Sequence, residues 1–323
     1  MSCYDVIVVG AGAAGMAAAA SARSNGAGRV LLIDRNAHMG GILKQCIHDG
    51  FGLIVFGESL TGPEYAARYV RKLHEADIYV QLNAMVTRIT PNKEVLCATR
   101  GGIKKHNANA IILTTGCRER TRGMLAVPGA RPAGIYTAGV LQKLINIQNL
   151  RPGNRAVVLG SGDIGMIMAR RMVLEGIEVV CVLEKLPYMS GLLRNKNQCL
   201  DDYGIPLKLC HTVTDIRGSK RIEGVTAASV DLAGRLISGT EFTIDCDMLV
   251  LSVGLIPENE LAKACGIKTD EAGGPVVNEL LETSIAGIFS AGNSLHIHSL
   301  VDYASKEGED AGRFAAEFAR REP

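Results

Sequence analysis

Residues 5–15 of the chain read DVIVVGAGAAG, and residues 155–165 read RAVVLGSGDIG. In each copy a short apolar run leads into the pattern G-x-G-x-x-G and then into a stretch of helix-forming residues. The first glycine of this pattern makes a sharp turn, the second lets a pyrophosphate approach the backbone, and the third lets the helix pack against the strand. The three glycines of the first copy recur 150 positions later in the second. They are Gly10, Gly12 and Gly15, then Gly160, Gly162 and Gly165.

Each copy continues into a second apolar run that ends with an acid. Val30–Ile33 is followed by Asp34, and Val179–Leu183 is followed by Glu184, in both cases 19 residues after the third glycine. An acid at this place accepts hydrogen bonds from the hydroxyls of a ribose, while the helix N-terminus attracts phosphates. The repeat therefore predicts two Rossmann-like dinucleotide sites in an α/β protein.

Composition agrees with two domains and excludes several other classes of protein. The 323 residues carry 35 Lys and Arg against 33 Asp and Glu, so no electrostatic surface for nucleic acid or anionic membrane is indicated. A hydrophobic share of 47% excludes disorder. Val6–Ala20 is apolar but glycine-rich and lacks a basic leading segment, so it is interpreted as a strand and turn, not a signal peptide. We expect no membrane span.

The nine cysteines are scattered, and no two form C-x-x-C. This excludes zinc ribbons, iron–sulfur runs and the usual redox pair. Free cysteines in such number are typical of a reducing compartment, and a cytoplasmic protein is expected.

The rest of each half predicts a helix and a small β-meander. Thr61 to Glu64 forms a capping box with proline in the first turn, opening a helix through about Ala76. Strands are expected after it in the first half, and further strands in the second half around Val225–Asp231 and Arg235–Ile244. The spacing of apolar residues near the C-terminus predicts a helix packed on a sheet.

The order of these features resembles the flavoproteins of the pyridine nucleotide–disulfide oxidoreductase superfamily, at the size of thioredoxin reductase. The resemblance rests on the two motifs with their acids, Met39-Gly40-Gly41, Thr115-Gly116, Gly254-x-x-Pro257 and Ala291-Gly292. It implies an FAD-binding domain made of residues 1–117 and 246–323. It also implies an inserted NAD(H)-binding domain of residues 118–245.

The resemblance also implies which residues contact the two cofactors. Asn293 stands where the family usually has Asp, and a helix starting near residues 299–301 would point its N-terminus at the flavin. The FAD candidates are Gly10, Gly12, Ala14, Gly15, Asp34, Arg35, Gly40, Gly41, Val86, Thr115, Gly116, Gly292, Asn293 and Leu300. The NAD candidates are Gly160, Gly162, Asp163, Ile164, Gly165, Glu184 and Gly254.

The chain departs from the disulfide reductases of this superfamily at the flavin. Where the larger members carry C-x-x-x-x-C, this sequence has Leu43 and His48, with Cys46 between them. A dithiol relay is excluded, which leaves Cys46 as a possible single redox thiol. Lys44, Cys46 and His48 are the candidate catalytic residues. The alternative to a catalytic role is that Lys44 is a solvated loop lysine, Cys46 a buried residue that packs as a small hydrophobe, and His48 a hydrogen-bonded histidine of the core.

Three segments resemble one subgroup, the short FAD/NAD flavoproteins that accompany anaerobic glycerol-3-phosphate-dehydrogenase-type flavoproteins in bacteria. More distantly they resemble the A subunits of opine oxidases and hydrogen cyanide synthase. The segments span residues 40–52, 160–171 and 292–302. The last contains His296 and His298, which lack a Cys or an acid beside them. We expect no metal site and interpret them as loop residues near the flavin or a partner.

These observations predict an FAD-dependent, NAD(H)-linked oxidoreductase that exchanges electrons with a larger flavoprotein dehydrogenase. Glu184 would repel a 2′-phosphate, which favours NADH over NADPH, although the neighbouring Lys185 weakens that preference. One alternative is a self-sufficient NADH-dependent reductase or oxidase of a small acceptor. Another is a non-catalytic structural protein that contains FAD, for which a damaged second motif would be expected. A homo-oligomer is also possible.

Overall fold

The computed structural model describes residues 2–321, and the chain divides into two compact units. Unit 1 is Met1–Arg118 with Ile256–Pro323, and unit 2 is Glu119–Leu255. The second boundary falls after the expected Cys246, because strand β15 (Met248–Leu251) pairs with the central strand of unit 2 and belongs to its sheet. The expected α/β architecture with parallel sheets is confirmed.

Unit 1 is built on a seven-stranded sheet with the order β3-β2-β1-β6-β5-β4, in which β17 also pairs with β6. Strands β3, β2, β1, β6 and β17 are parallel, whereas β4 and β5 extend the sheet as an antiparallel ribbon. The strands are β1 (Ser2–Val9), β2 (Val30–Ile33), β3 (Tyr79–Gln81), β4 (Met85–Ile89), β5 (Glu94–Thr99), β6 (Gly102–Leu113) and β17 (Ile288–Ser290).

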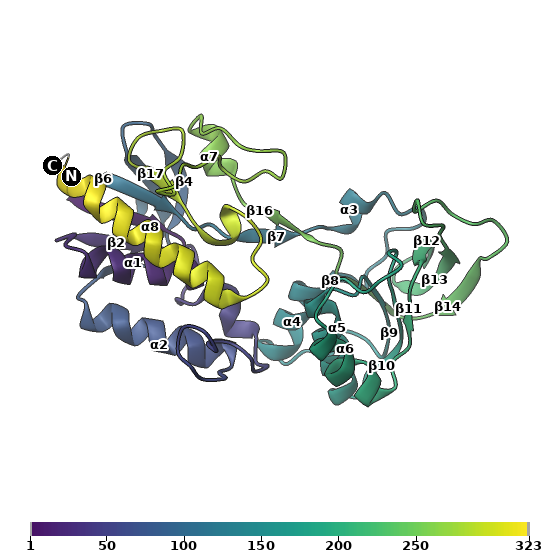
Figure 1. Ribbon diagram of the computed structural model, residues 1–323. Coiled ribbons are helices and arrows are strands. Elements are labelled where there is room, and N and C mark those ends of the chain that lie inside the picture. Colours follow the sequence, from purple (N-terminus) through teal and green to yellow (C-terminus); the bar gives the residue numbers. More distant parts are fainter. Residues whose placement is uncertain (1, 322–323) are drawn as a thin grey trace. The chain divides into compact units, whose positions relative to one another are not determined.

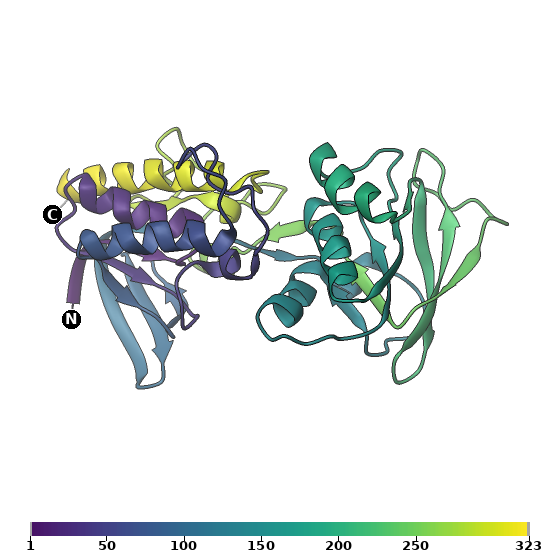
Figure 2. The same cartoon turned by 90° about the horizontal axis from the view of Figure 1, so that it is seen from below.

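Three helices of unit 1 lie side by side on one face of this sheet, as Figures 1 and 2 show. They are α1 (Ala13–Ser24), α2 (Gly62–Glu75) and α8 (Val301–Arg321). The other face packs against the β4–β5 ribbon and the short α7 (Glu260–Ala264). The capping box predicted at Thr61 and Glu64 is confirmed, with both of its hydrogen bonds present.

Helices α1 and α8 approach each other closely because small residues meet at their crossing. A Cβ atom on Gly308 would lie 2.2 Å from the carbonyl oxygen of Ala14, and one on Gly312 would lie 2.3 Å from that of Ala18. Any larger residue would force the helices apart. The prediction that the C-terminal helix packs on the core is confirmed, since Ala311 is fully buried.

Unit 2 repeats the parallel arrangement with the strand order β11-β10-β9-β15-β8, all parallel. A separate antiparallel sheet has the order β12-β13-β14, and β7 pairs with β16. The strands of unit 2 are, besides β15, β8 (Ile135–Thr137), β9 (Arg155–Leu159), β10 (Glu178–Leu183), β11 (Leu207–Lys208), β12 (His211–Gly218), β13 (Ile222–Ser229) and β14 (Phe242–Asp245). Strands β7 (Cys117–Glu119) and β16 (Leu255–Pro257) each span a boundary between the two units in the sequence. The helices are α3 (Arg122–Leu125), α4 (Ala138–Asn146), α5 (Asp163–Leu174) and α6 (Leu193–Cys199). The 3₁₀ turns of the chain are η1 (Gly41–Gln45), η2 (Asp201–Tyr203) and η3 (Gly292–Ser294).

The strand predicted at Arg235–Ile244 is wrong in its first part. Asp231 accepts hydrogen bonds from the backbone amides of Ala233 and Arg235, both at 2.9 Å, and from Arg235 Nε at 2.8 Å. These contacts hold the turn that precedes the predicted strand. A second turn at residues 238–239, where Thr240 Oγ1 donates to the Ile237 carbonyl at 2.6 Å, interrupts the strand itself, so regular pairing begins only in β14. Within residues 2–321, no helix is both long and apolar enough to cross a membrane.

Candidate functional site

The first glycine-rich turn lies between β1 and α1, and each glycine has a distinct steric role. Gly10 has φ 109°, and its Cβ would lie 2.3 Å from the Thr114 carbonyl oxygen. Gly15 lies so close to the turn that its Cβ would be 1.8 Å from the oxygen of Gly10. A Cβ on Gly12 would meet no described atom within 4 Å. The backbone at the start of α1 is therefore open on the side where a pyrophosphate would approach.

Asp34 follows β2 and is nearly buried, with 8% of its surface exposed. Its Oδ2 accepts the amide of Ala11 at 2.6 Å, and its Oδ1 accepts the amide and side-chain nitrogen of Asn36 at 2.7 and 2.9 Å. These bonds hold the carboxylate beside the glycine-rich turn. The next residue, Arg35, is exposed.

The predicted Gly-Gly pair lies against the same turn. Gly40 has φ 108° and donates its amide to the Ala11 carbonyl at 2.8 Å. Gly41 has φ 51°, and its Cβ would lie 3.2 Å from the Cα of Gly12. Because a side chain at Gly41 would crowd the open backbone of Gly12, small residues at both places keep the turn accessible.

The end of β6 meets the turn from the other side. Thr114, which the sequence did not single out, donates through Oγ1 to the carbonyls of Val9 and Gly10, both at 3.0 Å. Thr115 Oγ1 donates to the Glu258 carbonyl at 2.6 Å, and Gly116 follows with φ 76°. Val86 is buried in β4, on the opposite face of the sheet from α1.

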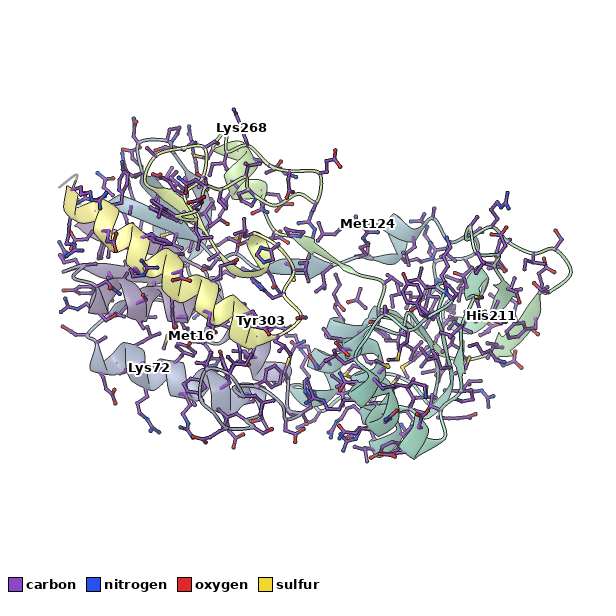
Figure 3. All side chains as sticks on the ribbon, viewed as in Figure 1. Met16, Lys72, Met124, His211, Lys268 and Tyr303 are labelled. Atoms are coloured by element: carbon purple, nitrogen blue, oxygen red, sulfur yellow. The ribbon has the colours of Figure 1, made fainter. Side chains whose placement is uncertain are left out.

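The segment between β17 and α8 returns to the first turn of α1. Gly292 has φ 72°, and its Cβ would lie 2.6 Å from the Cβ of Ala14. Asn293 Nδ2 donates to Cys117 Sγ at 3.6 Å, and its Oδ1 accepts the amide of His298 at 3.0 Å. Leu300 directly precedes α8, whose first turn carries the exposed Tyr303 (Figure 3).

Two acids of α8 were missed by the sequence reasoning. Asp302 is 2% exposed and accepts the amides of Gly52 at 3.1 Å and Val55 at 2.9 Å, which holds that loop on the helix. Glu307 Oε2 accepts the Gly292 amide at 2.5 Å and lies 3.1 Å from His298 Nε2. Asp302 ends the segment 292–302, but the loop that it holds lies about 250 residues away along the chain. Glu307 lies outside the segments compared in the sequence.

The three candidate catalytic residues lie in or after η1 and have different surroundings. Cys46 is 7% exposed, with its Sγ 3.3 Å from the Ile42 carbonyl oxygen. His48 is half-buried, and its ring centroid is 4.9 Å from that of Phe51. Lys44 is exposed. Their catalytic role stays a prediction.

The glycine-rich turn of unit 2 has the same construction. Gly160 has φ 98°, and its Cβ would lie 2.0 Å from the Ser252 carbonyl oxygen. Gly165 donates its amide to Ser252 Oγ at 3.1 Å, and a Cβ there would lie 2.7 Å from the Ser252 Cβ. A Cβ on Gly162 would lie 3.2 Å from the same hydroxyl. Ser252 therefore occupies the place that Thr114 holds in unit 1.

Glu184 is 5% exposed and is held even more firmly than Asp34. Its Oε2 accepts the amide of Ser161 at 2.9 Å, the Ser161 hydroxyl at 2.6 Å and the Ser190 hydroxyl at 3.2 Å. Its Oε1 accepts the amide of Leu186 at 3.0 Å. The carboxylate is thus fixed beside the second glycine-rich turn.

The other NAD candidates are spread around this turn. Asp163 Oδ1 accepts the Leu192 amide at 2.8 Å and Asn195 Nδ2 at 2.7 Å, which ties the start of α6 to the start of α5. Ile164 is half-buried. Gly254 is exposed, has φ 104°, and accepts the Arg120 amide at 3.0 Å.

None of the nine cysteines, all of which lie within residues 2–321, forms a disulfide. Burial raises the pKa of Cys181 and that of Cys246 to about 11. Both side chains therefore stay protonated at neutral pH and are poor nucleophiles.

Known proteins resemble this chain over most of its length. The family described as "Pyridine nucleotide-disulphide oxidoreductase" matches residues 4–308. The solved structure of T. acidophilum thioredoxin reductase is similar with a TM-score of 0.80 and 25% identity, covering 98% of this chain and 99% of that one.

Among curated proteins, the opine oxidase A subunit of Agrobacterium tumefaciens (strain Ach5) is 26% identical over 97% of this chain. The HcnB subunit of hydrogen cyanide synthase from Pseudomonas protegens is 26% identical over 96% of it. For that synthase the sequence resemblance pointed to the A subunits, whereas the relative found is HcnB. The chain spans 64% of the length of the first relative and 69% of that of the second. NAD(P)H sulfur oxidoreductase (CoA-dependent) of Pyrococcus abyssi is 23% identical over 89% of this chain, which spans 62% of its length.

Proposed function

Because the chain belongs to the pyridine nucleotide-disulphide oxidoreductase family, whose members use FAD and NAD(P)H, we propose that it passes electrons between NADH and a partner flavoprotein dehydrogenase. The observation that carries this proposal is the repeated pairing of an acid with the glycine-rich turn. Ala11 donates to Asp34 in unit 1, and Ser161 donates to Glu184 in unit 2, each pair 23 residues apart. Two dinucleotide sites in one chain suit an enzyme that transfers electrons between two cofactors.

We assign FAD to unit 1 and NADH to unit 2. Unit 1 gathers the larger set of predicted contacts around its turn, including Gly40, Gly41, Thr115 and Gly292. The open backbone at Gly12 and the helix N-terminus behind it would bind the pyrophosphate, and Asp34 would bind a ribose. When bound, FAD exchanges a hydride with the nicotinamide, so the protein must supply mainly orientation and electrostatics.

Glu184 supports NADH as the preferred nicotinamide. Its carboxylate is buried and accepts four hydrogen bonds from Ser161, Leu186 and Ser190, so it cannot swing away to make room for a 2′-phosphate. An ionised carboxylate at this position repels that phosphate and accepts from the free ribose hydroxyls. The neighbouring Lys185 is exposed, and its positive charge would weaken this preference by attracting a 2′-phosphate.

Two observations support a separate protein as the second electron partner: the names of the relatives and the spacing of the cysteines. The relatives from opine oxidase and hydrogen cyanide synthase are both named as subunits. This chain has no C-x-x-C through which electrons could pass to a disulfide. We therefore place the second electron partner on another protein, a larger flavoprotein dehydrogenase of glycerol-3-phosphate or a similar small substrate.

A second candidate is a reductase that acts alone on a small acceptor. The relative named NAD(P)H sulfur oxidoreductase supports it. In that case Cys46, buried beside η1, would be the single redox thiol. NADH turnover with a free acceptor, lost in Cys46→Ala and independent of any partner, would favour this candidate.

The test is an anaerobic visible spectrum of the purified chain before and after NADH, with NADPH in parallel. We expect a flavin spectrum that NADH bleaches faster than NADPH does. Gly162→Val should keep the flavin and lose the bleaching, because the added side chain would collide with Ser252 Oγ and fill the approach to the turn. Gly101→Ala, in an exposed turn, is the matched control. Loss of flavin from Gly162→Val would mean that the two cofactors are assigned to the wrong units.

A further inference from the structure

His296, His298 and Glu307 gather where the segment after β17 meets α8. Glu307 lies on α8, nine residues after His298, and its carboxylate reaches back to both imidazoles. His298 Nε2 is 3.1 Å from Glu307 Oε2, and His296 Nδ1 is 3.5 Å from Glu307 Oε1. The two rings have centroids 4.2 Å apart, so all three side chains face one small volume. The expectation of no metal site rested on the lack of an acid near the two histidines, and Glu307 is that acid.

We propose that these three residues form a binding site for a divalent transition-metal ion such as Zn²⁺. One ligand atom from each residue lies within 4.8 Å of the others. A tetrahedral Zn²⁺ ion with bonds of about 2.0–2.1 Å holds its ligand atoms roughly 3.3 Å apart. The separations from the imidazoles to the carboxylate are close to this value: His298 Nε2 lies 3.1 Å from Oε2, and His296 Nδ1 lies 3.5 Å from the other oxygen, Oε1. Two imidazoles and one carboxylate are a donor set that transition metals favour over Mg²⁺ or Ca²⁺.

The surroundings of Glu307 also suit a metal ligand. Its side chain is 14% exposed and that of His298 is 10% exposed, so water competes weakly for both. The Gly292 amide donates to Glu307 Oε2 at 2.5 Å, a contact of the kind that orients ligating carboxylates. The side chain of His296 is 58% exposed, which leaves a fourth position open to solvent.

The bound ion would hold the segment that carries His296 and His298 against α8. Without the ion, the carboxylate of Glu307 is the shared partner of His296 and His298. With it, the three donors would share one ion, and the chain from Gly292 to His298 would be fixed at both ends. The site lies wholly within unit 1 and does not depend on the assignment of the two dinucleotides.

The first test measures zinc retained after equilibrium dialysis of the purified full chain at micromolar free Zn²⁺ with a thiol-free reductant. The variants are His296→Ala and Glu307→Gln, and the control is His74→Ala, an exposed histidine of α2. We expect the unaltered chain and the control to retain one more equivalent than the two variants, whose affinity falls more than tenfold. Equal zinc in all four proteins would overturn the proposal, since it would assign the metal to the free cysteines. Absence of zinc from all four would overturn it as well.

The second test identifies the donor atoms by X-ray absorption at the zinc edge. Nitrogen and oxygen donors at about 2.0–2.2 Å with an imidazole signature are expected, whereas sulfur at about 2.3 Å would overturn the proposal. If Glu307→Gln does not fold, His296→Ala decides the matter, because its largely exposed side chain makes folding independent of it.

Discussion

Tyr65 donates a hydrogen bond of 2.7 Å from its hydroxyl to Ser305 Oγ, and both residues are completely shielded from solvent. The bond joins α2 to α8 on the helical face of unit 1. Burial raises the pKa of Tyr65 far above its usual value, so the hydroxyl remains a donor at every pH the protein meets. The contact is therefore a fixed link between the helix that follows η1 and the helix that carries Glu307.

Tyr65→Phe should lower the free energy of unfolding by about 1–3 kcal/mol, because it leaves the buried Ser305 hydroxyl without this partner. Urea denaturation followed by circular dichroism measures the change. Tyr303→Phe, at an exposed position of α8, is the control and should fall within about 0.5 kcal/mol of the unaltered chain. Equal stabilities for the two variants would contradict the importance of the buried bond.

Two alanine substitutions in the first glycine-rich turn should separate folding from FAD binding. Gly15→Ala places a Cβ 1.8 Å from a backbone oxygen and should destabilise unit 1 by roughly 1–3 kcal/mol. Gly12→Ala meets no described atom within 4 Å, so the protein should fold normally and bind FAD at least about tenfold more weakly. Thermal unfolding and the ratio of flavin to protein absorbance check the pair. Full FAD occupancy in Gly12→Ala would show that the pyrophosphate does not approach there.

Glu184→Gln should reduce the preference for NADH over NADPH by about tenfold, which corresponds to roughly 1.4 kcal/mol of binding free energy. The substitution removes the charge that repels a 2′-phosphate while keeping the size of the side chain. Titration of flavin bleaching with each nucleotide gives the two affinities. Glu178→Gln, which removes an exposed ion-pair partner of Arg155, is the control and should leave the preference unchanged.

The buried cysteines should resist alkylation far beyond neutral pH. A pKa of about 11 in place of 9.0 leaves Cys181 and Cys246 with roughly a hundredfold less thiolate at pH 8 than an ordinary thiol. Iodoacetamide followed by peptide mass spectrometry should therefore modify the exposed Cys3 first. The ionised fraction of the two buried thiols grows only as pH rises towards 11, so their modification should accelerate there. Rapid modification at pH 8 would show that these sites open to solvent.

The sequence predicted the parts of the site that depend on local backbone geometry. The glycines at 10, 12 and 15 and the acid at 34 lie at fixed spacings because one turn and one crossover set their distances. The same reasoning found Glu184, and both acids lie beside their turns as the spacing requires.

Other features depended on contacts between distant segments and could not be predicted. Asp302 meets Gly52 and Val55 across about 250 residues of chain, and nothing in the spacing of these residues indicates the contact. The contact of Glu307 with His296 and His298 could not be predicted for a related reason. Glu307 lies on α8, whereas the two histidines lie in the segment that precedes this helix. The partly wrong strand at residues 235–244 reflects a turn at residues 238–239, held by the hydrogen bond from Thr240 Oγ1 to the Ile237 carbonyl, which the apolar pattern did not indicate.

The discontinuity of unit 1 has a consequence for how the chain acquires its structure during synthesis. Unit 2 is one continuous segment, whereas the sheet and helical face of unit 1 need β17 and α8, which are translated after all of unit 2. Until then, the alanine-rich side of α1 lacks the glycines of α8 that cover it. Unit 2 is therefore fully synthesised while β17 and α8, which complete unit 1, have still to be made. The contacts of Gly292 and Gly308 with Ala14, in the first turn of α1, form only once α8 has been made, so we expect flavin uptake to follow the synthesis of α8.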